Sequence, residues 1–468
     1  MKDPKYKFTV AICGGGIAGL TAALAIAHFS RDHKDILIDI YESSSGFTEI
    51  GAGVSMYRRP WEIMKALNLE QPLREIAEIP ESDEELRPSF EMRKSDQKEG
   101  ITFSHPKLPF GIVSLHRAHF LDVLAKNLDL TQTRVHFSKR LVTYSLPRDA
   151  SSSDPIVLHF QDGTSSKCDI LVGADGIHSI VRQSLLTFAS SELEQGEADK
   201  VRLRNKIEPL WSGTIAYRAL IPSEKLRALN PSHRTLYSAV NYGGKDKHIV
   251  VFPISQGQQV NVVAFVSQPE KEGSFYDKPW VHDANKDTLY AEYEGWEDEV
   301  QQLLQCVDMT SIWAIHALDA IPICSHNRVT LIGDAAHAMT PHLGSGAGVA
   351  IEDAYVLGAF LASPMTTISS LPGVLRLYQS IRLPKGNEVQ HRSRIQGKIY
   401  EQSFHYIPKS KEANLDSSTI DANDTIFFDI KESLEASGKI VEENRKWVGR
   451  PGVDEELKHA LELLQTTL

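Results

Sequence analysis

The feature that most constrains the fold is a glycine-rich segment near the amino terminus, Gly14-Gly15-Gly16-Ile17-Ala18-Gly19. It follows the apolar run Phe8–Cys13, which has the length of a buried strand, and leads into the helical pattern LTAALAIAHF. A second apolar run, Ile36–Tyr41, ends at Glu42, 23 residues past the last glycine. This arrangement predicts a βαβ unit that binds a dinucleotide.

Each glycine of this fingerprint has a predicted task. Gly14 permits the tight turn, Gly16 lets the backbone approach a pyrophosphate, and Gly19 lets helix and strand pack closely. Ile17 and Ala18 lie between them in the predicted cofactor site, and Glu42 is placed to bind the ribose hydroxyls of an adenosine moiety. The fingerprint does not distinguish NAD from FAD.

A second strand–turn–helix joint lies far along the chain, at 328–348 (RVTLIGDAAHAMTPHLGSGAG). Its strand ends at Asp334, whose carboxylate can accept hydrogen bonds from a sugar-like hydroxyl. The backbone N–H groups at the following helix start favour negative charge. The joint is therefore predicted to hold a polar ligand, with a purely structural joint as the alternative. The turn residues of this predicted site are Pro341, Gly344, Gly346 and Ala347.

Three shorter segments add candidates. DILVGADGIHSIVR (169–182) is another strand that ends in an acid and a glycine, Asp175-Gly176. The predicted helix Ser114–Leu128 carries Arg117 in its first turn, where the helix dipole disfavours a cation unless a phosphate or carboxylate binds there. Gly53 belongs to a glycine-rich loop whose backbone is expected to pass close to another group. Arg58 and Arg59 follow it, and either hold an anionic ligand or form a solvated basic turn.

The middle of the chain loses the βαβ pattern. Residues 187–317 are predicted to form a mostly antiparallel sheet packed against the dinucleotide domain, and a small-molecule pocket is expected at such an interface. In TIAYRALI the alternation is mixed, so either Tyr217 or Arg218 faces inward. Residues 400–468 carry no chemical motif, and could cover the pocket or form a subunit contact. The predicted strands are Gly213–Ile221, Thr235–Asn241, His248–Ile254 and Gln259–Phe265.

Composition excludes several classes of protein. A net charge of −11 at pH 7 and a pI near 5.9 argue against nucleic acid as the main partner. The four cysteines are widely spaced, without CxxC or zinc-finger spacing, and His337 and His342 stand alone in a loop, so no metal is expected. No signal peptide or membrane-length apolar run is present, which predicts a soluble, cytoplasmic enzyme that does not bind membranes.

Three signatures now stand in order: GGGIAG with Glu42, DILVGADGIHSIVR, and RVTLIGDAAHAMTPHLGSGAG. Over roughly residues 6 to 395 the chain resembles the class A flavoprotein aromatic hydroxylases of the salicylate hydroxylase and hydroxybenzoate hydroxylase branch. The resemblance implies an α/β fold with a discontinuous, glutathione-reductase-like, Rossmann-type FAD-binding domain (1–75, 106–186 and 318–361). It further implies an α+β substrate domain with an antiparallel sheet (76–105 and 187–317), followed by a helical C-terminal region (362–468).

The same resemblance implies the cofactor and its contacts. FAD would lie with its pyrophosphate at Gly14, Gly16 and Gly19, and with its adenosine ribose at Glu42. Arg117 would reach the FAD, Asp334 would bind its ribitol and pyrophosphate portion, and 341–348 would lie along the isoalloxazine. Asp175 and Arg182 would serve both the FAD and a visiting NADH or NADPH. Tyr57-Arg58-Arg59 departs from the family pattern, which leaves the substrate contacts open.

The implied reaction is hydroxylation of a small phenolic aromatic acid with NAD(P)H and O2 through a flavin C4a-hydroperoxide, with or without decarboxylation. Such chemistry needs a base or proton relay near the substrate hydroxyl. Tyr217 is the first choice, with Arg218 as the alternative group that stabilises phenolate or carboxylate. An NAD-dependent dehydrogenase, a flavin oxidase and a non-catalytic FAD-fold protein are the rival hypotheses, and a homodimer is left open.

Overall fold

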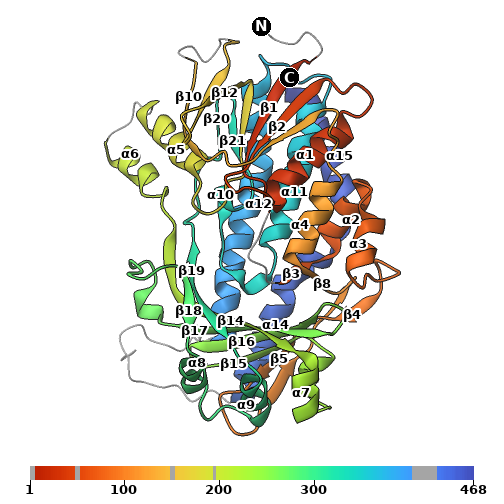
Figure 1. Ribbon diagram of the computed structural model, residues 1–468, viewed down its shortest axis with the longest axis vertical. Helices are drawn as coiled ribbons and strands as arrows, with labels where there is room; N and C mark the ends of the chain where they lie inside the picture. The colour runs from red at the N-terminus through yellow and green to blue at the C-terminus, as the bar shows by residue number, and fades with distance from the viewer. Residues whose placement is uncertain (1–5, 48–52, 148–152, 193–196, 403–429, 468) are drawn as a thin grey trace, which may run out of the picture.

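The computed structural model describes residues 6–47, 53–147, 153–192, 197–402 and 430–467. Two large sheets dominate it and lie toward opposite ends of the molecule's long axis (Figure 1). Strands β1 and β2 belong to a six-stranded sheet near the top of that view, and β14, β16 and β17 to an eight-stranded sheet near the bottom. The mixed α/β class predicted from the sequence is confirmed.

The six-stranded sheet has the order β20-β21-β13-β1-β2-β9 and is parallel except for the β20–β21 pair. Its central strands are almost wholly buried apolar runs, as expected for a parallel sheet covered on both faces. The predicted strands Phe8–Cys13 and Ile36–Tyr41 are confirmed as β1 and β2. The remaining strands are β9 (Thr133–His136), β13 (Ile170–Gly173), β20 (Ser325–His326) and β21 (Val329–Leu331).

Helices α1 (Ile17–Phe29) and α11 (Gly346–Ala362) pack side by side against this sheet. A Cβ atom at Gly358 would lie 2.6 Å from the Cβ of Ala25, so the two helix backbones approach closely because both positions are small. Helix α1 follows the glycine-rich turn of the first predicted joint, and α11 follows that of the second. Their packing therefore brings these two distant segments together.

Strand β9 does not pair with the strands that follow it in the chain, because it pairs parallel with β2 of the six-stranded sheet. The antiparallel neighbours form a separate three-stranded sheet of β10 (Leu141–Ser145), β11 (Ile156–Phe160) and β12 (Ser165–Cys168). Local alternation does not encode which distant strand a short strand pairs with.

The eight-stranded sheet has the order β18-β19-β14-β17-β16-β15-β5-β6 and is antiparallel except for the β15–β5 pair. Segment 76–105 supplies two of its strands, β5 and β6. The predicted strand Thr235–Asn241 is largely wrong, because a 3-10 turn occupies Arg234–Leu236 and the strand starts at Val240. The strands are β5 (Glu91–Lys94), β6 (Ile101–Ser104), β14 (Leu210–Pro222), β15 (Val240–Gly244), β16 (Lys247–Ile254), β17 (Gln259–Ser267), β18 (Val281–Ala284) and β19 (Thr310–Ala317).

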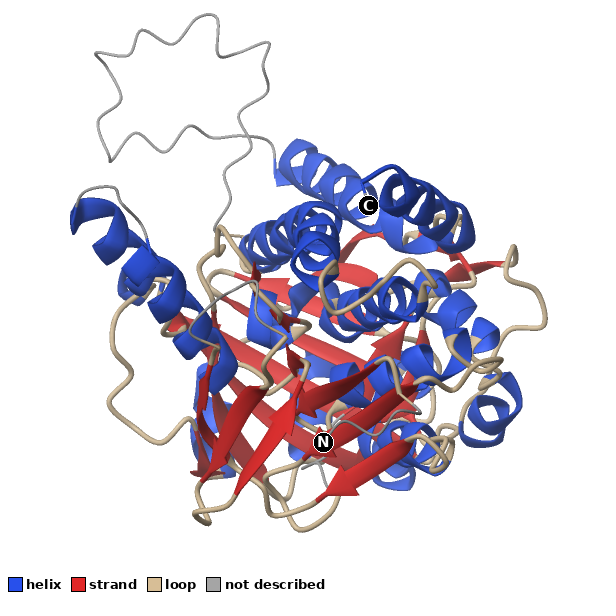
Figure 2. Ribbon diagram, turned by 90° about the horizontal axis from the view of Figure 1, so that it is seen from above, coloured by secondary structure: helices blue, strands red, loops and turns tan. Residues whose placement is uncertain are grey.

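Most helices gather on one side of the strands, as Figure 2 shows. The described part of the C-terminal region is mainly helical: α14 packs against α12 and β6, and α15 packs against α11 and α12. No helix of the described ranges is long and apolar enough to cross a membrane. The other helices are α2 (Arg58–Ala66), α3 (Glu70–Ile76), α4 (Arg117–Lys126), α5 (Ile180–Glu192), α6 (Glu197–Arg204), α7 (Ser223–Leu229), α8 (Lys286–Glu292), α9 (Asp298–Gln305), α10 (Asp334–His337), α12 (Leu371–Tyr400), α14 (Ile430–Lys446) and α15 (Val453–Thr467). The short strand pairs are β3 (Gly53–Met56) with β8 (Val113–His116), and β4 (Leu86–Pro88) with β7 (Lys107–Pro109).

Candidate active site

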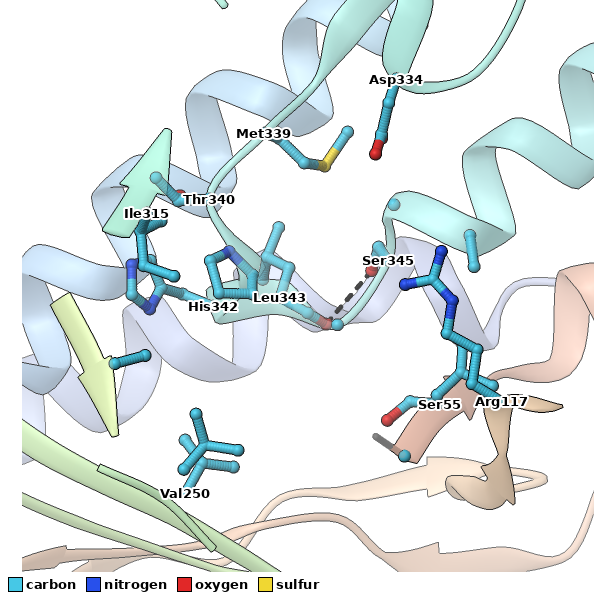
Figure 3. Close-up of a pocket in the computed structure, with 18 of the residues that line it drawn as sticks. Ser55, Arg117, Val250, Ile315, Asp334, Met339, Thr340, His342, Leu343 and Ser345 are labelled. Carbon is cyan, nitrogen blue, oxygen red and sulfur yellow. Dashed lines mark hydrogen bonds between the residues drawn. The ribbon is translucent and has the colours of Figure 1, made fainter. Parts of the chain in front are cut away.

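A cavity of about 450 Å³ lies where the loops that follow β1 and β21 face the eight-stranded sheet. Its wall on the sheet side is made by residues of β14, β15, β16, β17 and β19. Figure 3 shows the loop of Met339, Thr340, His342, Leu343 and Ser345 along one side of this space. The residues predicted for the site that line it are Gly16, Ile17, Ala18, Gly53, Arg117, Arg218, Asp334, Pro341, Gly344, Gly346 and Ala347.

Three helices begin at this cavity: α1, α4 and α11. None of them has a side-chain cap hydrogen bond or an acidic residue in its first turn. The first N–H groups of a helix lack intrahelical partners and carry partial positive charge. Three such ends around one cavity fit a ligand with several anionic groups, such as a dinucleotide pyrophosphate.

Arg117 is the first residue of α4, and the residues predicted to begin that helix, from Ser114, belong instead to strand β8. Burial lowers the pKa of the Arg117 guanidinium, and Asp334 partly offsets that effect. Arg117 and Asp334 point into the same space from opposite sides in Figure 3. The two residues come from segments more than two hundred positions apart: Arg117 follows β8, which pairs with β3, and Asp334 follows β21 of the parallel sheet.

The surroundings of the fingerprint glycines show why a larger residue would not fit at two of these positions. Gly14 has φ +106°, and a Cβ there would lie 2.2 Å from the carbonyl oxygen of Ala174. A Cβ at Gly19 would lie 2.0 Å from the carbonyl oxygen of Gly14, so this position carries the close packing of α1 on β1. Gly16 differs, since no protein atom lies within 4 Å of its Cβ position and it faces the cavity. The geometry fits a ligand that approaches the backbone at Gly16.

Glu42 lies beside this loop at the end of β2. One carboxylate oxygen accepts a hydrogen bond from the N–H of Gly15 (2.8 Å), and the other accepts one from the N–H of Ser44 (2.7 Å). Glu42 is not among the residues that line the cavity. Its contact with an adenosine ribose therefore stays a prediction.

Asp175 has a different position from the one predicted. Its carboxylate accepts hydrogen bonds from the Ser179 hydroxyl and from the N–H groups of Ile180 (2.9 Å) and Val181 (3.1 Å), and so caps α5. Arg182 donates to three backbone carbonyls, one of them that of Ala335 (3.1 Å). Both side chains are used within the protein, and the backbone of the Asp175 joint, at Ala174 and Gly176, lines the cavity.

Neither alternative for Arg58 and Arg59, an anion site or a solvated basic turn, agrees with the structure, because both side chains are buried in ion pairs within the protein. Arg58 pairs with Glu62 (3.0 Å), and Arg59 pairs with Glu352 (2.7 Å) and Glu456 (2.9 Å). These arginines are buried because the protein supplies their counter-charges, not because a ligand does. The neighbouring Tyr57 does line the cavity.

The directions in which side chains point on β14 distinguish the two candidates for the catalytic residue. Arg218 faces the cavity, with its guanidinium 4.7 Å from the centre of the Trp313 ring. Tyr217 faces the opposite side of the sheet and is buried in that side's apolar core. Burial raises the pKa of Tyr217, and Glu292 and Tyr276 raise it further. The prediction of Tyr217 as base is wrong, because its side chain does not reach the cavity.

The variant Tyr217→Phe should therefore keep its hydroxylation rate. In the described residues the Tyr217 hydroxyl has no hydrogen-bond partner, and its removal leaves the core volume almost unchanged. We expect kcat/KM within about twofold of the native value. The measurement is steady-state product formation at saturating FAD, and a loss of tenfold or more would contradict the assignment.

Several cavity residues had no signal in the sequence. Asn241, Tyr400 and Arg445 all line it, although no local motif surrounds them. His342 lines it too; burial and the nearby His248 lower the pKa of its imidazole to about 3. No cluster of potential metal ligands occurs among the residues described.

The charge of the cavity is opposite to that of the chain. Among the described residues, the charged side chains that line it are those of Arg117, Arg218, Arg445 and one acid, Asp334. The chain as a whole carries −11. Burial and the like charge of Arg117 lower the pKa of Arg218 to about 10, and an anion in the cavity would relieve both effects.

A parallel sheet whose loops and helix starts face a second sheet across one cavity fits a dinucleotide-dependent oxidoreductase. Residues 7–393 match the family described as FAD binding domain. Salicylate hydroxylase of Pseudomonas putida is 35% identical over 411 residues, 86% of this chain and 87% of that protein. The 6-methylsalicylate 1-monooxygenase of Aspergillus terreus is 32% identical over 397 residues, 83% of this chain and 82% of that protein.

A solved structure, described as a salicylate hydroxylase substrate complex, superposes with a TM-score of 0.77 at 27% identity. It covers 97% of this chain and 98% of that chain. The chain belongs to the class A FAD-dependent aromatic monooxygenases. FAD is its cofactor, and the enzyme hydroxylates an aromatic substrate.

Proposed function

We propose that this monooxygenase hydroxylates a phenolic aromatic acid with NADH or NADPH and O2. The observation that carries the proposal is the excess of arginine side chains over acidic ones among the described residues that line the cavity. Val250, Phe252 and Val263 supply a flat apolar wall for a ring, and three arginines against one aspartate favour an anion. Part of this positive charge serves the cofactor at Arg117, which leaves Arg218 and Arg445 for other anionic groups.

FAD, once reduced by the nicotinamide, supplies the electrons that activate O2 for transfer of one oxygen atom to an electron-rich ring. The protein would hold FAD with the starts of α1, α4 and α11 and with Asp334. The open N–H groups at Gly346 and Ala347 would stabilise negative charge near the flavin. Arg218, on the opposite wall, would stabilise negative charge that develops at the cofactor end of the cavity.

The phenolic hydroxyl of the substrate must lose its proton, and a base near that hydroxyl was predicted for this step. His342 is at the cavity wall, and both its ring nitrogens lack a hydrogen-bond partner in the described ranges. Its pKa of about 3 makes it a weak base, since efficient general bases have a pKa near the working pH. A cation that lowers the pKa of the substrate phenol is the better physical explanation, and the cavity supplies cations.

The names of the two relatives support a reaction in which the oxygen atom is added at the ring carbon that carries the carboxylate. Both named relatives act on salicylates, one as a 1-monooxygenase. In that reaction the C–COO⁻ bond breaks, a C–O bond forms, and CO2, water and the oxidised nicotinamide are released. Simple ring hydroxylation, which retains the carboxylate, is the alternative.

The test is NADH and NADPH oxidation with salicylate, 6-methylsalicylate and 4-hydroxybenzoate, with mass analysis of products and measurement of CO2. Stimulated oxidation with a product one oxygen richer, or with CO2 released, supports the proposal. Oxygen uptake that does not depend on the nicotinamide would indicate a flavin oxidase. No stimulation by any of these acids would contradict the substrate class.

Arg218→Met should lower turnover while FAD stays bound. The variant removes the one charged side chain that the sheet contributes to the cavity wall among the described residues. We expect kcat to fall about 100-fold, the loss typical of one group that stabilises developing negative charge. Tyr217→Phe, the neighbouring position on the opposite face of β14, is the matched control. Equal kcat in both variants would remove Arg218 from the mechanism.

A further inference from the structure

Arg445, near the end of α14, closes one end of the cavity from the C-terminal region. Its guanidinium donates hydrogen bonds to the hydroxyl of Tyr57 (2.9 Å) and to the hydroxyl of Tyr400 (2.8 Å). The three residues come from the start of α2, the end of α12 and α14, and all are buried. Tyr57 in turn donates to the carbonyl of Leu343, which fixes this cluster to the loop before α11.

The charge of Arg445 has no partner in the described part of the chain. No carboxylate lies within ion-pairing distance, and its Nε–H has no acceptor. The guanidinium is 5.4 Å from the centre of the Phe90 ring, another cavity residue. A buried cation without an anion is costly, so a structure that keeps one normally binds an anion there.

Three other buried arginines of this protein pair with carboxylates, whereas a fourth, Arg182, donates to three backbone carbonyls. Arg59 pairs with Glu352 (2.7 Å), Arg93 with Glu297 (2.6 Å), and Arg382 with Asp353 (2.9 Å). At Arg445, two neutral tyrosine hydroxyls occupy the place that a carboxylate takes beside these three arginines. They orient the guanidinium without neutralising it, which leaves its charge and its Nε edge for a ligand.

A second unpartnered donor lines the same cavity. The Nδ2 amide of Asn241, on β15, is buried and has no hydrogen-bond partner in the described ranges. Strand β15 pairs with β5, the strand that follows Phe90. Donors without acceptors at one end of an aromatic cavity call for a ligand that carries only acceptors, and a carboxylate meets that requirement.

We propose that Arg445, oriented by Tyr57 and Tyr400, binds the carboxylate of the aromatic substrate. This inference rests on the proposed function and assigns the recognition of the acid to the C-terminal region. Arg218 belongs to β14, whereas helix α14, which carries Arg445, packs against β6, and strands β17, β16, β15 and β5 lie between these two positions. The two arginines therefore have separate tasks: Arg445 sets affinity for the acid, and Arg218 affects turnover.

The experiment compares acids with their neutral amides. Salicylate, 4-hydroxybenzoate, salicylamide and 4-hydroxybenzamide are titrated into the FAD-loaded enzyme, and binding is read from the change in flavin absorbance. Arg445→Met should weaken binding of the acids about 10- to 100-fold and change binding of the amides less than about threefold. FAD content should be unchanged, and kcat at saturating acid should fall far less than KM rises.

Two further variants keep the test decisive if Arg445→Met folds poorly. Arg445→Lys keeps the charge but loses the planar donor edge, so acid binding should weaken by an intermediate factor. Tyr400→Phe, which removes one orienting hydroxyl, should weaken acid binding several-fold with the amides unaffected. Arg450→Met, an exposed arginine five residues on, is the matched control and should bind both classes as the native enzyme does.

The outcomes separate the two proposals. A native enzyme that prefers acids, with that preference lost in Arg445→Met, supports the inference. A native preference that persists in Arg445→Met, or equal weakening of acids and amides, overturns the role of Arg445 alone. A native enzyme that binds the amides as tightly as the acids overturns the aromatic-acid substrate class, and the role of Arg445 with it.

Discussion

Gly19→Ala is expected to abolish FAD binding by preventing α1 from packing on β1. The added methyl group would lie 2.0 Å from the carbonyl oxygen of Gly14, which is backbone and cannot turn aside. Helix α1 is buried along most of its length between β1 and α11, so it cannot shift outward without opening the core. We expect a loss of more than about 4 kcal/mol in the free energy of unfolding. The protein should be recovered without flavin, or largely as insoluble material.

Gly16→Ala separates cofactor approach from protein packing. No protein atom lies within 4 Å of the added methyl group, so the apoprotein should unfold at the native temperature. FAD binding should weaken at least about tenfold, or about 1.4 kcal/mol, because the methyl group occupies the space predicted for the pyrophosphate. Gly46→Ala, at a partly exposed and equally open position, is the control and should bind FAD normally. Native FAD affinity in Gly16→Ala would move the pyrophosphate away from this turn.

The parts predicted correctly are those that local sequence encodes. The fingerprint at Gly14 needs a strand before it and a helix after it, so its presence implied both elements and their order. Asp334 and Arg117 were found because each breaks a local expectation: an acid at a strand end, and a cation in a first helical turn. The cavity contains both of them.

The incorrect assignments involve long-range structure. Which of Tyr217 and Arg218 reaches the cavity depends on which face of the sheet the cavity occupies. The mixed hydrophobic pattern of β14 does not show which face that is. Arg59 looked like a ligand-binding residue because its partners Glu352 and Glu456 are about three hundred and four hundred positions away. Arg445 was missed for the opposite reason: a lone arginine in an amphipathic helix resembles a solvated one until its burial is known.

A buried ionic network behind the cavity should dominate the stability of the fold. Arg382 of α12 donates to Asp353 (2.9 Å) and Glu352 (3.0 Å) of α11. Asp353 also pairs with His337 (2.6 Å) and accepts the N–H of Gly333 (3.1 Å), the residue before Asp334. The network therefore fixes the turn that presents Asp334 to the cavity.

Arg382→Met should destabilise the protein by about 3–5 kcal/mol, because it leaves the buried Asp353 carboxylate without a guanidinium partner, although Glu352 keeps Arg59. Burial raises the pKa of Asp353, but His337 and Arg382 more than offset it and hold the pKa below its usual value. Without Arg382 that pKa should rise, so protonation at low pH relieves the penalty. The loss should thus be larger at pH 8 than at pH 5.

Urea unfolding followed by tryptophan fluorescence measures this difference, and the same helix offers a matched control. Arg392 pairs with Glu388 four residues earlier, and both side chains are partly exposed (33% and 58%). Arg392→Met should change the free energy of unfolding by no more than about 0.5 kcal/mol. Solvent already screens the Arg392 pair, whereas the carboxylates beside Arg382 have no water to replace the lost cation. Equal shifts in the two variants would show that the charges around Asp353 contribute no more than an exposed pair.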